Sequence, residues 1–371
     1  MIPVQRPYLG SEELEAVRKV FDSRWLGMGS TTKEFEDKLR ERLGAKHVIA
    51  VNTGTSALHM ALAALNLQAG DEVIVPSLTF VASVQVILAV GARPVFCDVH
   101  VDSLNMDVAD AFRRVTARTR AIMPVHYGGE ACDMDALLPL AREHRLWVVE
   151  DAAHAFGSTY KGHQVGTLGD VTCFSFDPIK NITCGEGGAV VTEHDELYNR
   201  MVPQRILGID NDTWSRYRNE RNWFYAVTMP GFRYHLSNIN AAIGLEQLKR
   251  FDVFRARKVE IVRRYDEAFQ SLSNLALLKH DLVETFPFFY IVRVLGGQRD
   301  TFMKYMKEKG IATGVHYIPN HIQPLFESNR QPLPVTEQVF EEMVTLPLHF
   351  ELTDADVETV INAVRGFFKA T

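Results

Sequence analysis

Short runs rich in valine and isoleucine alternate with helical patterns from about Val48 to Thr192. Ala/Leu-rich stretches such as Met134–His144 separate the runs, which lie at Val73–Val75, Arg93–Asp98, Ala121–Val125 and Val148–Glu150. This alternation predicts an α/β fold with a mostly parallel sheet and helices on both faces. Ligands of such sheets bind beyond the C-terminal ends of the strands. Functional residues are therefore expected directly after each run.

Lys180 lies on a tight connection between two predicted strands. Val171–Phe176 precedes it, and a glycine-rich turn leads from it into Ala189–Thr192. Glycine lets backbone approach a ligand closely, so a long amine here is well placed for binding or catalysis. Most lysines after a strand are solvated surface charges, however, and position alone does not identify a catalytic residue.

Asp151 follows the apolar run Leu146–Glu150 and is expected at the C-terminal end of a strand. An aspartate in such a place often caps a turn. Together with Lys180 it has a more specific meaning. A lysine that can form a Schiff base and an aspartate that can hold a pyridinium N–H are the pair that pyridoxal phosphate requires.

A third element fits the same cofactor. The strand His47–Val51 runs through Gly54 and Thr55 into a predicted helix. The N-terminus of a helix offers free N–H groups and the positive end of the helix dipole, which together suit a phosphate. The segment matches neither a P-loop nor a Gly-x-Gly-x-x-Gly fingerprint, so nucleoside triphosphate or NAD binding has little support.

Composition excludes several other classes of function. The 371 residues are enough for one or two domains, and 46% hydrophobic residues are enough for a sizeable core. The net charge of -6 comes without a basic tract, so no nucleic-acid partner is expected. No apolar run reaches the roughly 18 residues of a membrane span. The start, Met1-Ile-Pro-Val, does not resemble a signal peptide, and a cytoplasmic location is expected.

No metal site is expected either. The four cysteines lack Cys-x-x-Cys spacing and lie in or beside apolar segments, which favours buried free thiols in a reducing compartment. They are Cys97, Cys132, Cys173 and Cys184. His126 and His163 also lack the spacing of metal ligands.

With these motifs, the whole chain resembles the sugar-nucleotide aminotransferases of the DegT/DnrJ/EryC1/StrS family. These are fold-type I (aspartate aminotransferase-like) pyridoxal phosphate enzymes. The most specific motif is the lysine segment with its tail Gly185-Glu-Gly-Gly188. Supporting motifs are Trp25-Leu-Gly-Met-Gly-Ser30, Gly70–Phe80, Pro124-Val-His-Tyr-Gly128, Glu150-Asp-Ala-Ala-His154, Asn238–Gly244, His316–His321 and Leu346-Pro-Leu-His349.

The resemblance implies a large cofactor-binding domain over residues 1–245 and a smaller C-terminal α/β domain over residues 246–371. It leaves open whether the N-terminal segment packs on the small domain. In the C-terminal part the pattern predicts one long helix from Ile239 to about Leu272. Strands are then expected at Phe286–Val294 and near Gly314–Tyr317, and helices at Asp300–Lys309 and Asp354–Phe367. The polar segment from Arg205 to Tyr225 predicts a long ordered loop or a mobile flap, with a surface excursion as the alternative.

The family's roles carry over residue by residue. Lys180 is the implied catalytic residue, which forms the Schiff base and moves a proton, while Asp151 pairs with the ring nitrogen. His154 is expected at the 3′-oxygen of the cofactor, with a polar turn residue as the alternative. Phe80 stands where the family places an aromatic on the pyridine face, although simple core packing explains it nearly as well. Gly54, Thr55 and Ser175 match the phosphate-binding positions.

A partner subunit completes the phosphate site in this family, so a homodimer with shared active sites is implied. Arg233 stands where relatives carry asparagine, within Gly231-Phe-Arg-Tyr-His235. An arginine could still bind the phosphate, and more strongly. Candidates for contact with the sugar or nucleotide are His316, Tyr317 and His321, for which a packed strand and loop is an equal alternative.

The implied reaction is transamination of a nucleotide-linked keto-sugar, with glutamate as amino donor. The Gly-Glu-Gly-Gly tail favours a 4-keto-6-deoxyhexose, and the product would be an amino sugar for surface polysaccharide, glycolipid or secondary-metabolite biosynthesis. A 3-keto-sugar is the alternative, and dTDP, UDP and GDP stay open as the nucleotide. Asp177 departs from the histidine or aromatic of many relatives, which weakens any substrate assignment by analogy.

Two other classes are less favoured. Dehydratases of this family replace the lysine by histidine, whereas Lys180 is retained here. A non-catalytic regulatory relative would not need Lys180, Asp151 and the Gly54-Thr55 turn intact.

Overall fold

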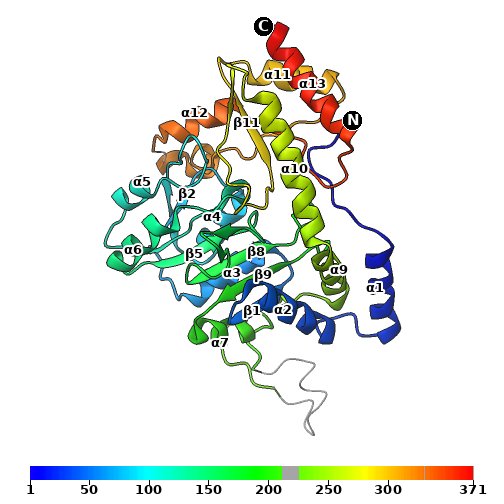
Figure 1. Ribbon diagram of the computed structural model, residues 1–371. Helices are drawn as coiled ribbons and strands as arrows, with labels where there is room; N and C mark the ends of the chain where they lie inside the picture. Colours follow the sequence, from blue (N-terminus) through cyan, green and yellow to red (C-terminus); the bar gives the residue numbers. More distant parts are fainter. Residues whose placement is uncertain (211–224, 330, 371) are drawn as a thin grey trace.

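A seven-stranded sheet forms the larger part of the computed structural model, which describes residues 1–210, 225–329 and 331–370 (Figure 1). The strand order is β1-β9-β8-β5-β4-β2-β3. All neighbours are parallel except β9, which runs antiparallel to both β1 and β8. The strands are β1 (His47–Val51), β2 (Glu72–Pro76), β3 (Arg93–Cys97), β4 (Thr119–Ile122), β5 (Trp147–Asp151), β8 (Val171–Ser175) and β9 (Gly188–Thr192).

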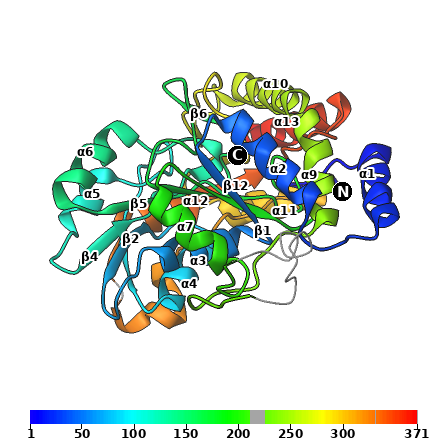
Figure 2. The same ribbon diagram turned by 90° about the horizontal axis from the view of Figure 1, so that it is seen from below.

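Helices cover both faces of this sheet (Figure 2). One face packs against α3 (Gly54–Ala64), α4 (Val81–Ala89) and α7 (Asp195–Gln204). The other face packs against α2 (Ser30–Leu43), α5 (Val108–Arg113), α6 (Met134–His144) and α9 (Asn238–Lys249). The alternation along β1 shows why, because Ile49 points into the first core and Val48 into the second.

Short elements complete this part of the chain. Helix α1 (Ser11–Ser23) packs beside α9, and β6 (Thr159–Tyr160) and β7 (His163–Gln164) form a small hairpin. A 3-10 turn, η1 (Tyr127–Gly129), follows β4. Several helices begin at side-chain caps, which satisfy N–H groups of their first turns. These caps are Thr53 for α3, Asp107 for α5, Asp133 for α6 and Ser237 for α9.

A second, three-stranded sheet lies in the C-terminal part, in the order β10-β11-β12 and antiparallel throughout. The elements here are α10 (Phe251–Phe269), β10 (Leu275–Leu277), β11 (Tyr290–Val294), α11 (Arg299–Glu308), η2 (Asn320–Ile322), η3 (Pro324–Asn329), α12 (Pro334–Glu342), β12 (Met343–Leu346) and α13 (Asp354–Ala370). Their apolar side chains form a separate core. The long helix α10 connects the two parts of the molecule (Figure 1).

The N-terminal segment packs on the C-terminal part of the molecule. The sequence had left open whether it does so. Ile2 pairs with Ile311, and the Leu348 N–H donates to the Val4 carbonyl. Both termini therefore lie near α13 in Figure 1.

Some expected boundaries were wrong. The long helix predicted from Ile239 is two helices, because the backbone leaves helical geometry at Arg250. The strand predicted from Phe286 begins only at Tyr290, and the strand near Gly314 is a single bridge to Thr345. The expected domain boundary at residue 245 falls inside α9, and the division into two domains stays a prediction. Most of the predicted flap, residues 211–224, lies outside the described residues.

The four cysteines are buried and free, as predicted. Among the described residues, no helix is long and apolar enough to cross a membrane, and no group of histidine, cysteine and carboxylate side chains could hold a metal ion.

Gly157 and Gly162 allow a matched test of packing between the two parts. Both have positive φ, +86° and +80°, but a Cβ on Gly157 would lie 1.9 Å from the Phe251 ring, whereas Gly162 has open space. We predict that Gly162→Ala costs about 1 kcal/mol of unfolding free energy for its backbone conformation alone. Gly157→Ala should cost a further ~1–3 kcal/mol because the start of α10 must shift. Urea unfolding of both variants measures the difference, and equal losses would contradict this account of the contact.

Candidate active site

Strand β9 brings the predicted phosphate-binding residues to one edge of the sheet. Gly188 pairs with Val51 on one side and with Ser175 on the other. The backbones are so close that a Cβ on Gly188 would lie 2.5 Å from the Thr53 carbonyl oxygen, and one on Gly54 would lie 2.7 Å from the Ser175 Cβ. The start of α3 and the end of β8 therefore form one continuous surface, which we call the floor of the site. It lies at the C-terminal ends of the strands, where ligand binding was expected.

The N-terminus of α3 presents backbone N–H groups at this floor. Thr53 caps the helix through its Oγ1, which accepts from the Ser56 N–H at 3.0 Å. Gly54 and Thr55 form the first turn, whose N–H groups have no partner inside the helix. The Thr55 side chain is exposed. With Ser175 alongside, these groups suit an anion such as a phosphate.

Asp151 ends β5 with its carboxylate fixed in place and only 4% exposed. Its Oδ1 accepts from the Ala153 N–H at 3.1 Å, and its Oδ2 accepts from the Ser83 hydroxyl at 2.6 Å. Ser83 lies on α4 and also shares a 2.8 Å hydrogen bond with the Thr79 hydroxyl. Sequence reasoning missed Ser83, and its only signal was its place one turn after Phe80.

Lys180 lies on the connection between β8 and β9, and its amine is 4.5 Å from the centroid of the Phe288 ring. Burial lowers the pKa of Lys180 to about 8, while the charges of Asp177 and Asp151 act in the opposite direction. A lysine with a depressed pKa supplies more free amine at neutral pH, which is what a nucleophile or proton acceptor needs.

Aromatic side chains lie around the Lys180 amine. His154 stacks on Phe288 with ring centroids 4.4 Å apart, and its Nε2 lies 3.1 Å from the Tyr317 hydroxyl. Burial, followed by the charges of Lys180 and His316, lowers the pKa of His154 well below its ordinary value. Its Nδ1 has no hydrogen-bond partner among the described residues, so one ring nitrogen is left for a ligand. Phe288 was not predicted as a site residue.

Of the other predicted positions, Phe80 is exposed beside the site, whereas His316 and His321 bond neighbouring side chains. Phe80 is 53% exposed and lies 5.4 Å from the Tyr317 ring, so it faces open space beside the site rather than a core. His316 stacks on Phe289 at 4.4 Å and bonds Thr345. His321 is 1% exposed, and its ring bonds Ser77 and Glu337, which favours the alternative of a packed loop.

These residues fit pyridoxal phosphate. A buried amine, a fixed carboxylate and the N-terminus of a helix meet at the same edge of the sheet. The unpartnered His154 Nδ1 is an additional donor or acceptor that no described protein group satisfies. This set matches the aldehyde, the ring nitrogen and the phosphate of that cofactor.

The comparisons with known proteins agree with the site. The sequence model of the DegT/DnrJ/EryC1/StrS aminotransferase family matches residues 7–365. The chain belongs to this family. It is therefore a pyridoxal phosphate-dependent aminotransferase, and its fold is that of the fold-type I enzymes.

Individual relatives cover the whole chain. The spore coat polysaccharide biosynthesis protein SpsC of Bacillus subtilis is 38% identical over 99% of this chain and 97% of its own. The putative sugar aminotransferase Spr1654 of Streptococcus pneumoniae, in its PMP form, is 31% identical with a TM-score of 0.94, covering 100% of both chains. PseC of Helicobacter pylori, an aminotransferase involved in pseudoaminic acid biosynthesis, is 28% identical with a TM-score of 0.92, again over 100% of both chains.

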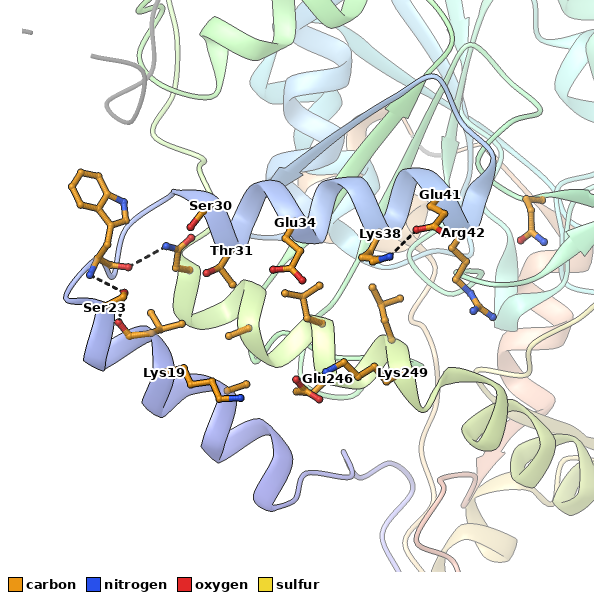
Figure 3. Close-up of a pocket in the computed structure, with 18 residues that line it drawn as sticks. Lys19, Ser23, Ser30, Thr31, Glu34, Lys38, Glu41, Arg42, Glu246 and Lys249 are labelled. Carbon is orange, nitrogen blue, oxygen red and sulfur yellow. Dashed lines mark hydrogen bonds and ion pairs between the residues drawn. The ribbon is translucent and has the colours of Figure 1, made fainter. Parts of the chain in front are cut away.

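A separate groove of about 1040 Å³ lies between α1, α2 and α9 (Figure 3). Its rim is charged, with the ion pairs Lys38–Glu41 and Lys249–Glu246. None of the residues of the candidate active site lines it. The groove is therefore not where the chemistry takes place.

The hydroxyl of Ser83 gives a first test of this site. We predict that Ser83→Ala lowers the turnover number about tenfold, because a hydrogen bond to a charged group contributes about 1.5 kcal/mol or more. Ser11→Ala, at an exposed position of α1, is the control. Steady-state kinetics of the two variants decide, and an unchanged turnover number for Ser83→Ala would show that Asp151 does not need this bond.

The pKa of Lys180 gives a second test. Below pH 8 most of this amine is protonated and cannot attack an aldehyde. The rate at which the cofactor-free protein captures pyridoxal phosphate should therefore rise about tenfold per pH unit below pH 8 and level off above it. Stopped-flow absorbance follows the reaction. A midpoint near the ordinary lysine pKa of 10.5 would contradict the depressed value.

Proposed function

We propose that this enzyme transfers an amino group from glutamate to a nucleotide-linked 4-keto-6-deoxyhexose and releases a 4-amino sugar. The names of the relatives support a sugar as acceptor, because SpsC is named for a polysaccharide pathway and Spr1654 as a putative sugar aminotransferase. The product would serve surface polysaccharide, glycolipid or secondary-metabolite biosynthesis, and the reaction would take place in the cytoplasm.

The observation that carries the proposal is that Lys180 and Asp151 lie at the same edge of the sheet. When bound, pyridoxal phosphate supplies an electron sink and holds the amino group between the two half-reactions. In our proposal the Lys180 amine attaches the cofactor and Asp151 holds its ring nitrogen. Gly54, Thr55 and Ser175 bind the phosphate, and Phe80 covers the ring.

Lys180 also has to move a proton. With pyridoxal phosphate and the amino donor bound, the Lys180 amine would accept a proton from the substrate carbon and later give it back. This needs the neutral amine, which burial favours. Burial lowers the pKa of His154 well below its ordinary value, which makes this ring a weaker proton acceptor than Lys180. His154 and Tyr317 are instead suited to hydrogen-bond an oxygen of the cofactor or the sugar.

Contacts with the sugar are proposed for His316 and Tyr317, because Tyr317 bonds His154 and lies beside Phe80, and the ring centroids of His316 and Tyr317 are 5.2 Å apart. Burial, followed by the charge of Lys180, lowers the pKa of His316 to about 4. His321 is less suited, because the described structure already uses both of its ring nitrogens.

The regiochemistry rests on the turn after the lysine. Gly185 adopts a positive φ of +78°, and its N–H is bonded to the Thr183 hydroxyl. Burial, followed by the charge of Asp177, raises the pKa of Glu186 in this turn. A rigid turn beside the amine can select one carbon of the sugar, because a shift of about 1 Å is enough to misalign reacting atoms.

A homodimer with shared active sites is also proposed. The Arg233 side chain is exposed, and it lines a groove of about 420 Å³ together with Trp25, Leu26, Gly27 and Met28. Two segments that resemble family motifs thus meet at the surface of one subunit. An exposed arginine there is available to a phosphate bound by a second copy.

The acceptor is tested by offering two nucleotide sugars side by side, one with a 4-keto group and one with a 3-keto group, each with glutamate. We predict that kcat/KM is at least about 100-fold higher for the 4-keto compound, because misplacement of the reacting carbon costs about that much. Product analysis by mass spectrometry and NMR gives the position of the amine. Turnover of the 3-keto compound alone would overturn the regiochemistry.

The shared site is tested by mixing two inactive variants, Lys180→Ala and Arg233→Ala. A hybrid dimer contains one site in which both residues are wild type, so up to about a quarter of wild-type activity is expected after subunit exchange. Neither variant should show it alone. Failure to complement, or a monomeric mass in solution, would contradict a shared site.

A further inference from the structure

Helix α10 carries a buried lysine that the mechanism above does not use. Lys258 is only 5% exposed, and its amine donates a hydrogen bond of 2.9 Å to the Asn181 Oδ1. Over residues 1–210, 225–329 and 331–370, it forms no ion pair with a carboxylate. Burying an amine without a counter-charge costs free energy. A methionine of similar length would fill this space without that cost.

The partner of Lys258 is the residue that follows Lys180 in the chain. The Asn181 side chain is buried, and its amide nitrogen donates to the Phe286 carbonyl at 3.2 Å. Its oxygen is held by helix α10 and its nitrogen by the segment before β11. Both ends of this amide are therefore fixed by residues outside the connection between β8 and β9.

The two lysines also share an aromatic neighbour. The Lys180 and Lys258 amines lie 4.5 and 5.7 Å from the centroid of the Phe288 ring. Phe288 is itself fixed, since its N–H donates to the Gly128 carbonyl at 2.8 Å. Burial, followed by the charge of Lys180, lowers the pKa of Lys258 to about 7. A neutral amine still donates an N–H, so the bond to Asn181 does not depend on the charge.

We propose that Lys258 is a positioning residue for Lys180: by holding the Asn181 side chain, it fixes the backbone from which the Lys180 amine is aimed. The inference rests on the proposed role of Lys180. It explains why a costly buried amine stands at this place, since stability is given up where it secures the geometry of a site. It also makes helix α10 a structural link between the C-terminal core and the cofactor floor.

The test compares Lys258→Met, which removes the donor, with Lys258→Gln, which keeps an N–H donor without the charge. Lys249→Met, at an exposed position of α9, is the matched control. Three quantities are measured: the rate of pyridoxal phosphate capture by the cofactor-free protein, kcat and KM of the loaded enzyme, and the unfolding midpoint in urea.

For Lys258→Met we expect capture and kcat to fall about tenfold, with KM for the acceptor changed less than about twofold, because misaimed amines lower the rate rather than the affinity. The unfolding midpoint should be unchanged or higher. Lys258→Gln should recover at least half of the lost rate on a logarithmic scale. Lys249→Met should match the wild type.

Wild-type capture and kcat in Lys258→Met would overturn the proposal. So would a Lys258→Gln variant as slow as Lys258→Met, which would assign the effect to charge or volume. A lower unfolding midpoint with rates that follow only the folded fraction would reduce Lys258 to a structural role and overturn it too.

An epistasis measurement keeps the proposal testable even if Lys258→Met does not fold. Lys258→Gln and Asn181→Ala are made singly and together, and the effects on capture are compared. If Lys258 acts through Asn181, Lys258→Gln changes nothing further once Asn181 is alanine; additive losses would contradict the proposal. Lys180→Ala is measured in parallel. Wild-type capture by that variant would refute the proposed role of Lys180 itself, whatever Lys258 does.

Discussion

The antiparallel insertion of β9 between β1 and β8 is the constraint on which the site depends. It places Gly188 opposite both Val51 and Ser175, so the end of β1, the start of α3 and the end of β8 meet within a few ångströms. In a strictly parallel arrangement the chain would need a long crossover between β8 and its neighbour. Here a short connection is enough, and that connection carries Lys180.

Burial then gives each functional group its chemical state. Lys180, His154 and Lys258 all have depressed pKa values with burial as the first cause. A cluster of amines and imidazoles in an aromatic environment cannot hold several positive charges at once. Asp151 is stabilised differently, by hydrogen bonds from Ser83 and the Ala153 backbone. The site thus combines bases whose protonated forms are disfavoured by burial with one fixed carboxylate.

Much of this could be predicted from the sequence, for a physical reason. Gly54, Asp151, Ser175 and Lys180 each lie at or just after the end of a strand, and the C-terminal ends of parallel strands meet at one edge. Their positions along the chain were therefore enough to bring them together.

The residues that support these groups were missed, because each contacts the site from a distant part of the sequence. Ser83 contacts Asp151 over 68 residues, and Lys258 contacts Asn181 over 77 residues. No local pattern announces such a contact, since both residues lie on helices whose buried positions read as ordinary packing. The break at Arg250 was missed because the apolar pattern continues through it.

The same distinction separates the residues that define the chemistry from those that make it precise. In our assignment the amine, the carboxylate and the helix N-terminus are the groups that hold the cofactor and support its chemistry. The supports come from elsewhere in the fold, with Ser83 on α4, Phe288 beside β11 and Lys258 on α10. Two of these three belong to the C-terminal part, which supplies neither the amine, the carboxylate nor the phosphate-binding residues of α3 and β8 in our assignment. The contact between α10 and Asn181 is therefore a means by which the smaller core can influence the aim of Lys180. A substitution in the C-terminal core that tilts α10 should then change the rate of catalysis before it changes the binding of the cofactor phosphate, because Gly54, Thr55 and Ser175 lie on α3 and β8.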